Sequence, residues 1–131
     1  MQMQGIPWDV YPTLAHLIRP TLEKFTEDGA HTVDDLEARI AARDMQCWIG
    51  GEGRIQVVCL TEIVPDRLKT CHIGFCAGEN FPDWVPLIEG IAAFARGIGC
   101  ARLRLTARPG YTKFLVQHGF RQTHIVLDRS L

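Results

Sequence analysis

Four residues, Gly50-Gly51-Glu52-Gly53, separate two apolar stretches and limit this chain more than any other feature of its sequence. The flanking segments, residues 46–49 and 54–64, are rich in side chains that favour strands, and glycines between two such runs predict a β-hairpin. Residues 65–67 make a further turn, and residues 68–76 are typical of a third strand. The chain therefore contains an antiparallel meander. Apolar residues on both faces of 55–64 predict that the second strand is central.

Two helices are expected before the meander. Asp9 can cap the first, in which Leu, Ile and Phe recur at helical spacing up to Phe25. Pro20 lies inside this pattern and should kink or split the helix near Arg19. The second helix begins at Thr32, because residues 32–35 (TVDD) match a capping box.

The remaining chain alternates between helix and strand. A long helix is expected after Asp83, with its apolar stripe on Trp84, Ile88, Ile91, Ala95 and Ile98. A strand at 101–106, a short helix from Pro109 and a last strand at 121–127 follow. The order α-α-β-β-β-α-β-α-β predicts an α/β (α+β) fold, with a mixed, mostly antiparallel sheet and helices on both faces. Its 131 residues fit one domain, residues 1–131.

Composition excludes several function classes. No run of about 18 apolar residues occurs, and the N-terminus has no secretory pattern, so the expected location is the cytoplasm, without a membrane partner. The formal net charge of −1 gives no general attraction to nucleic acid. Residues 101–131 nevertheless hold six basic residues and only one acidic residue, Asp128, which predicts a local basic surface or an anion site.

The five cysteines form no Cys-x-x-Cys pair, and their number is odd. We therefore expect reduced cysteines that pack as small apolar side chains, without a disulfide framework. Cys71, His72 and Cys76 lack a second pair at a usable spacing, so no metal site is expected there.

The order of elements resembles the fold of the GNAT superfamily of N-acetyltransferases over most of the chain. The most telling local match is residues 113–120 (KFLVQHGF), which look like the short helix that leads into a Gly-Phe pair in that family. The family's usual first strand is shortened or missing, with residues 5–8 as a remnant at best.

More narrowly, the chain resembles small GNAT-like proteins encoded by tailed bacteriophages. The shared segments are Pro7-Trp8, residues 32–36 (TVDDL), 45–48 (MQCW), 61–63 (TEI), Gly99-Cys100 and 108–111 (RPGY). Several proteins of that group lie near head and tail genes, and some are virion components. The resemblance thus implies a host-cell or virion location and a protein partner.

The family holds the diphosphate of acetyl-CoA with a loop before the long helix, where backbone amides and the helix dipole favour anions. The matching stretch here is residues 75–82 (FCAGENFP), in which Gly78 and Asn80 are the candidate cofactor-binding residues. Glu79 places a negative charge where the diphosphate would lie, and Pro82 removes a donor. Gly78 is also explained as an ordinary turn glycine.

Catalysis in this family needs a base for the amine and an acid for the thiolate. The family's acid is a tyrosine four residues before the glycine of the Gly-Phe pair, and Leu115 stands there, so Tyr111 is the substitute candidate. Glu62 is the first candidate base and His72 the second. Each has a plainer interpretation: a packed tyrosine, a solvated carboxylate and a structural histidine.

Arg102, Arg104 and Arg108 are the remaining anion-binding candidates. The first two share one face of a strand, and the cluster could contact CoA phosphates, pair with the acidic N-terminal helices or contact another chain.

Two functions follow from the resemblance. The degenerate loop and Leu115 favour a non-catalytic protein that binds a partner, in the virion or in the host. The complete order of elements favours a divergent N-acetyltransferase that uses acetyl-CoA as its acyl donor.

Overall fold

The computed structural model describes residues 2–131, apart from the side chains of Phe81 and Pro109. The elements follow the order β1 (Met3–Ile6), α1 (Tyr11–Phe25), α2 (Val33–Ala41), β2 (Gln46–Gly50), β3 (Val57–Val64), β4 (Thr70–Gly78), α3 (Phe81–Trp84), η1 (Val85–Leu87), α4 (Ile88–Gly97), β5 (Arg102–Leu105), η2 (Pro109–Tyr111), α5 (Thr112–Leu115) and η3 (Val116–His118).

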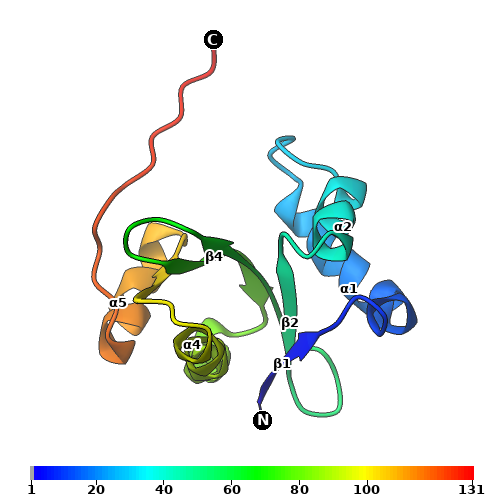
Figure 1. Ribbon diagram of the computed structural model, residues 1–131. Helices are drawn as coiled ribbons and strands as arrows, with labels where there is room; N and C mark the ends of the chain where they lie inside the picture. The colour runs from blue at the N-terminus through cyan, green and yellow to red at the C-terminus, as the bar shows by residue number, and fades with distance from the viewer. Residues whose placement is uncertain (1) are drawn as a thin grey trace.

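One five-stranded sheet organises these elements. The strands lie in the order β1-β2-β3-β4-β5, with antiparallel pairing from β1 to β4 and parallel pairing between β4 and β5. Helices α1 and α2 cover one face, while α4 and α5 lie on the other (Figure 1). The mixed, mostly antiparallel sheet with helices on both faces is the predicted fold class, which is thereby confirmed.

Each face of the sheet has its own apolar core. The α1–α2 core includes Ile18, Leu22 and Leu36 against Val58 and Leu60 of β3, and all five are fully buried. The α4-side core packs Ile88, Ile91 and Ala95 against Val57, Cys59, Cys71 and Ile73. Alternate residues of β3 therefore enter opposite cores, as the prediction of a central strand requires.

The first strand is present at Met3–Ile6, so the expectation that it is missing is wrong, and it begins two residues before the predicted remnant at residues 5–8. Strand β1 pairs with four of the five residues of β2, from Met3 opposite Gly50 to Ile6 opposite Cys47. A Cβ on Gly5 would lie 3.4 Å from the Trp48 ring, so glycine lets this edge strand lie directly on the indole.

Helix α1 is continuous, so the predicted break near Arg19 is also wrong. Ile18 and Leu22 flank Pro20, and both are 0% exposed in the α1–α2 core. Burial on both sides of the proline therefore holds the helix on the sheet despite one missing backbone hydrogen bond. Asp9 is not the cap, because Val10 occupies that position and no side chain caps the helix.

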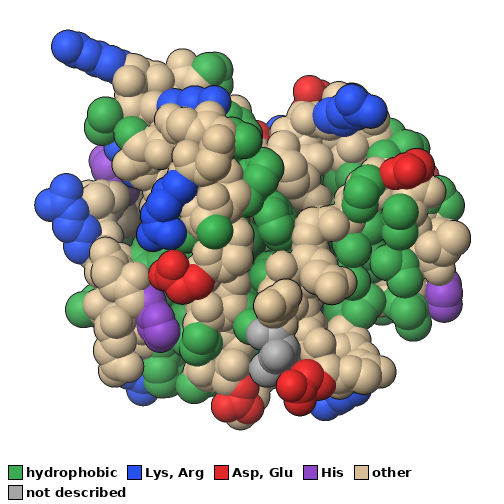
Figure 2. Space-filling model, turned by 60° about the horizontal axis from the view of Figure 1, so that its bottom comes forward, with side chains coloured by type: hydrophobic (Ala, Val, Ile, Leu, Met, Phe, Trp, Pro, Cys, Tyr) green, Lys and Arg blue, Asp and Glu red, His purple; other side chains and the backbone are tan. Residues whose placement is uncertain are grey.

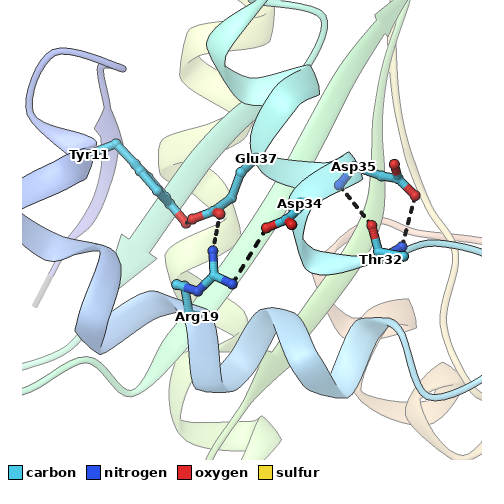
Figure 3. Close-up of polar contacts among 6 residues, drawn as sticks. All are labelled: Tyr11, Arg19, Thr32, Asp34, Asp35 and Glu37. Carbon is cyan, nitrogen blue, oxygen red and sulfur yellow. Dashed lines mark hydrogen bonds and ion pairs between the residues drawn. The ribbon is translucent and has the colours of Figure 1, made fainter.

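Helix α2 begins as predicted. The Thr32 side chain accepts a hydrogen bond from the Asp35 amide, and the Asp35 carboxylate accepts one from the Thr32 amide, both at 3.0 Å. These reciprocal bonds, shown in Figure 3, satisfy two amides that would otherwise lack partners. They also lower the pKa of Asp35.

A polar network joins α1 to α2 (Figure 3). The Tyr11 hydroxyl donates to Glu37 at 2.7 Å, and the Arg19 guanidinium binds the other oxygen of the same carboxylate. Arg19 also lies 3.6 Å from Asp34. Tyr11 is only 1% exposed, and burial together with the hydrogen bond to Glu37 raises its pKa far above the ordinary value.

Cysteine pairing corrects one further expectation. Cys59 of β3 and Cys76 of β4 are direct register partners, and a disulfide joins them, while Cys47, Cys71 and Cys100 are free. The expectation of five reduced thiols is therefore wrong, since spacing along the sequence does not reveal which residues face one another across two strands.

The structure also differs from the prediction at the long helix and at the last strand. The helix is interrupted, because Pro86 lies within η1 and only Ile88–Gly97 form the regular helix α4. Residues 121–127 form no strand, and the chain after Gly119 runs as an extended tail away from the body (Figure 1). Alternating apolar residues favour a strand, but a strand exists only where a neighbouring strand pairs with it.

No helix within residues 2–131 is long and apolar enough to cross a membrane. On the face shown in Figure 2, basic and acidic side chains are interspersed between apolar ones.

The raised pKa of Tyr11 predicts a pH dependence of stability. An unfolded tyrosine ionises near its ordinary pKa of 10.0, whereas the folded protein holds this hydroxyl neutral. The stabilisation from Tyr11 should therefore be complete below pH 10 and decline as the pH rises above it. Urea unfolding of the wild type and Tyr11→Phe should show a difference of about 1 kcal/mol at pH 8 that shrinks at pH 11. A difference that grows with pH would contradict this assignment.

Candidate functional site

The candidate site lies where β4 and β5 part. The two strands pair only from Thr70 opposite Arg102 to Ile73 opposite Leu105, and a last bond runs from the Thr106 amide to the Ile73 carbonyl at 3.2 Å. Beyond this point β4 continues to Gly78 without β5. We call the region around Ile73 and Thr106 the strand fork.

A β-bulge sits at the strand fork. Thr61 pairs with Ile73 and Leu60 pairs with Phe75, so Gly74 is the extra residue of β4. A Cβ on Gly74 would lie 3.6 Å from the His72 ring, which places this glycine beside the imidazole. Bulges often re-aim a side chain next to a functional site, and this one borders His72.

His72 binds two side chains through its two ring nitrogens. Nε2 lies 2.8 Å from the Thr106 hydroxyl, and Nδ1 lies 3.4 Å from the Glu62 carboxylate. A carboxylate on Nδ1 favours the tautomer that keeps the proton there. Nε2 is then the acceptor, and the Thr106 hydroxyl donates to it.

Glu62 is itself held in place. Its second oxygen accepts a hydrogen bond from Arg39, in the last turn of α2, at 3.0 Å. The Glu62 side chain is 33% exposed and that of His72 is 23% exposed, so water and small molecules reach both. Helix α2, strands β3 and β4 and the residue directly after β5 thus bring together a chain of four side chains: Arg39, Glu62, His72 and Thr106.

The three predicted anion-binding arginines occupy different settings. Arg102 donates to the Thr70 hydroxyl at 2.6 Å and lies 3.8 Å from Asp66, so it is engaged within the sheet. Arg104 is the register partner of His72, and its side chain makes no hydrogen bond or ion pair with the described residues. Arg108 lies exposed in the segment after Thr106. Arg104 is therefore the cation available beside the imidazole.

The candidate acid lies apart from this group. Tyr111 packs against the α4-side core, whereas Glu62 and His72 project from the opposite face, on which Arg39 lies. Leu115 is buried in the same α4-side core and carries no proton to donate. The structure thus brings Glu62 and His72 together and does not bring Tyr111 to them.

The polar groups of the predicted phosphate-binding loop already bind other groups of the protein. The Glu79 amide donates to the Gln56 carbonyl at 2.9 Å, and the Glu79 carboxylate pairs with Arg54 at 2.7 Å. The Asn80 side chain donates to Asp83, while the Asn80 backbone has a φ of 53°. A Cβ on Gly78 would lie 2.6 Å from the Gln56 carbonyl oxygen, so close packing already explains this glycine.

This loop does not fit a diphosphate. The helical segment that follows runs from α3 through η1 into α4, and its first turn is flanked by the carboxylates of Glu79 and Asp83. A hollow of about 450 Å³ beside the loop is lined by three carboxylates, those of Glu52, Glu79 and Asp83, and by the single guanidinium of Arg54. Negative charge therefore predominates at the loop that the sequence resemblance predicted to hold a diphosphate.

A larger hollow lies elsewhere, at the β1 edge of the sheet. It encloses about 780 Å³ and is mainly apolar, with Trp8, Ile40, Trp48 and Phe94 among its lining residues. It contains none of the predicted site residues. Its lining includes the charged residues Asp9 and Arg43, but the histidine bound to a carboxylate, an arrangement suited to acid–base chemistry, lies at the strand fork.

No group of three or more His, Cys, Asp or Glu side chains within residues 2–131 is arranged to hold a metal ion. Cys71 lies in the α4-side core, while His72 projects from the other face of the sheet.

Known proteins resemble this chain by structure. A probable acetyltransferase superposes with a TM-score of 0.74 at 15% identity, covering 100% of this chain and 97% of that one. Glucosamine-6-phosphate N-acetyltransferase from Arabidopsis thaliana gives 0.71 at 14% identity, over 98% and 97% of the two chains. An aminoglycoside acetyltransferase from an uncultured soil metagenomic sample, in complex with sisomicin, gives 0.69 at 12% identity, over 99% and 95%.

By sequence, no family model and no curated protein matches. The structural likeness extends over nearly the whole of each chain, and it shows that this protein has the GNAT fold of N-acetyltransferases. At these identities the likeness concerns the fold, so function must be argued from the site.

The sequence alone did not identify two members of the group at the strand fork, Thr106 and Arg39. Thr106 follows Arg102 and Arg104 at a spacing of two, which places the three on one strand face, but only the β4–β5 register shows that His72 lies there. Arg39 could not be linked to Glu62 from the sequence, because 23 residues separate them.

The contacts of the loop at residues 75–82 predict that the protein does not distinguish acyl donors by their diphosphate. Acetyl-CoA and S-acetylpantetheine share the acyl-bearing arm, but only the former carries the diphosphate and the nucleotide. Because the loop offers no diphosphate cradle, calorimetric titration should give dissociation constants within about threefold of each other.

Acetyl-CoA binding at least about tenfold tighter would show that the phosphates are held after all. Arg104→Ala serves as the control. If Arg104 binds the phosphates, this variant weakens the binding of acetyl-CoA only. If Arg104 instead contacts the acyl end, the variant weakens the binding of both ligands equally.

Proposed function

We propose that this protein is an acyltransferase that moves an acyl group from a thioester to an amine at the strand fork. One observation carries the proposal: His72 lies between an exposed hydroxyl at Nε2 and a carboxylate at Nδ1. A histidine that is oriented in this way can take a proton from a reacting group and later return it.

Each side chain has a distinct role in this proposal. His72 is the general base, Glu62 keeps its tautomer and stabilises the imidazolium that forms, and Arg39 holds Glu62 in place. Arg104 projects from the same face and supplies positive charge for the developing oxyanion. Tyr111 is left without a catalytic role.

The acyl donor is a thioester. The GNAT fold favours acetyl-CoA, because acetyltransferases share it. The loop of this chain argues that the donor is held by its acyl-bearing arm and not by its diphosphate, so CoA is one donor among thioesters with such an arm. When bound, the thioester supplies the activated carbonyl. The protein supplies the base and the charge.

A second function, that of a protein-binding component, is supported by the C-terminal tail. Ile125, Val126 and Leu127 are 67%, 78% and 83% exposed. Strand β5 pairs only with β4 among the described strands, so its other edge offers free backbone groups. Because the tail runs away from its own body, the partner that fits is a second copy whose β5 edge receives it. A phage or virion role for this assembly rests on the sequence resemblance alone.

Replacing the carboxylate tests the first function. Glu62→Gln keeps the shape but removes the charge that stabilises the imidazolium, so turnover of an acyl thioester with an amine should fall at least about tenfold. Glu89→Gln is a matched control, since Glu89 is an exposed carboxylate on α4 that pairs with Arg96. Equal rates for the two variants, with unchanged circular dichroism, would remove Glu62 from the mechanism.

Truncation tests the second function. Removing residues 121–131 should convert a dimer to a monomer in size-exclusion chromatography with light scattering, because the exchanged strand is lost. Val126→Lys should weaken the dimer in the full chain, since it puts a charge into the apolar contact. A wild-type protein that is monomeric at every concentration would contradict strand exchange and leave the acyltransferase proposal unaffected.

A further inference from the structure

The Thr106 hydroxyl, His72 and Glu62 lie in the order of a nucleophile, a base and an orienting carboxylate. The hydroxyl oxygen is 2.8 Å from Nε2, and Nδ1 is 3.4 Å from the carboxylate. The second distance is long, but such contacts are often loose before a substrate is bound. Thr106 is exposed, so its oxygen is open to a substrate that approaches the strand fork.

We propose that Thr106 is a nucleophile that carries the acyl group as a covalent ester between two half-reactions. This inference rests on the proposed acyltransferase function and adds a residue and an intermediate to it. The donor class is an acyl thioester, and the acceptor is an amine.

In the first half-reaction, Oγ1 of Thr106 attacks the thioester carbonyl and forms a carbon–oxygen bond, while its proton passes to Nε2 of His72. The carbon–sulfur bond then breaks, and the proton moves from Nε2 to the departing sulfur, which leaves as a neutral thiol. Glu62 offsets the transient charge of the imidazolium.

In the second half-reaction, the amine attacks the ester carbonyl and gives its proton to Nε2. The carbon–nitrogen bond forms, the bond to Oγ1 breaks, and the proton returns to Oγ1. The hydroxyl and the neutral imidazole are restored, so no further reactant is needed.

Two features of this chain favour the covalent route over direct transfer. The loop does not fit a diphosphate, because its Glu79 amide and carboxylate are already bound to Gln56 and Arg54. Once the acyl group is on the protein, the rest of the donor can leave before the amine binds. A donor that is held only by its acyl-bearing arm is therefore sufficient. Arg104, the register partner of His72, makes no hydrogen bond or ion pair with another described side chain, so its charge is available on the face from which His72 projects.

A hydroxyl that merely positions His72 is the competing explanation, and variants separate the two. Thr106→Val keeps the shape and removes the nucleophile, while Thr106→Ser keeps a nucleophile. His72→Gln removes the base, and Thr13→Val is the control, at an exposed hydroxyl of α1 that donates to the Val10 carbonyl. Circular dichroism establishes that each variant is folded.

The test is intact-mass spectrometry after acid quenching of the full chain with S-acetylpantetheine and no amine. The wild type, Thr106→Ser and Thr13→Val should gain one acetyl group, which peptide mapping places on residue 106. Thr106→Val and His72→Gln should gain none, and adding an amine should remove the acetyl group from the wild type. Turnover of Thr106→Val should fall by at least about a hundredfold.

The inference is overturned if the wild type gains no acetyl group and Thr106→Val turns over at the wild-type rate. In that case the acyltransferase function stands and the amine attacks the donor directly. If no amine is acylated by any form of the protein and no acetyl group appears on Thr106, the proposed function and this inference both fail.

Discussion

The parallel pairing of β4 with β5 ends after four residues, and the arrangement of the whole site depends on that ending. Up to Ile73 the two strands share backbone hydrogen bonds, and after Thr106 the chain turns away into η2. The Gly74 bulge in β4 sits at the same point and leaves His72 and Phe75 on one face although they are three residues apart. Without this break, β5 would continue beside β4, and Thr106 would be one more residue of an ordinary strand.

The two ends of β4 differ in how far they suit the acyl transfer proposed for this protein. At the far end of β4, the loop has become a self-contained turn, with Glu79 bound to Arg54 and Gly78 packed against Gln56. At the strand fork, by contrast, four side chains from α2, β3, β4 and the end of β5 form one hydrogen-bonded chain. The reacting centre proposed at the strand fork therefore does not depend on a diphosphate cradle, since about 20 Å of strand, at ~3.3 Å per residue, separates His72 from Gly78.

Local signals in the sequence predicted much of the fold. The glycines at 50–53 and the capping box at Thr32 gave correct elements, because a turn and a helix start are decided by a few neighbouring residues. Predictions failed where a distant contact decides. Pro20 stays within α1 because Ile18 and Leu22 are buried against β3, and Cys59 meets Cys76 only through the strand register. Of the site, Glu62 and His72 were predicted from residue type and position, whereas Thr106 and Arg39 required the sheet.

The central claim is that acyl donors bind at the strand fork, and backbone amide chemical shifts test it most directly. Titration of ¹⁵N-labelled protein with S-acetylpantetheine should move the amide signals of Ile73, Gly74, Thr106 and Ala107 most. The largest shifts at Ile6, Trp8, Cys47 and Trp48 would instead place the ligand in the apolar groove at the β1 edge. That outcome would contradict the account, because the Thr106–His72–Glu62 group would then lie outside the binding site.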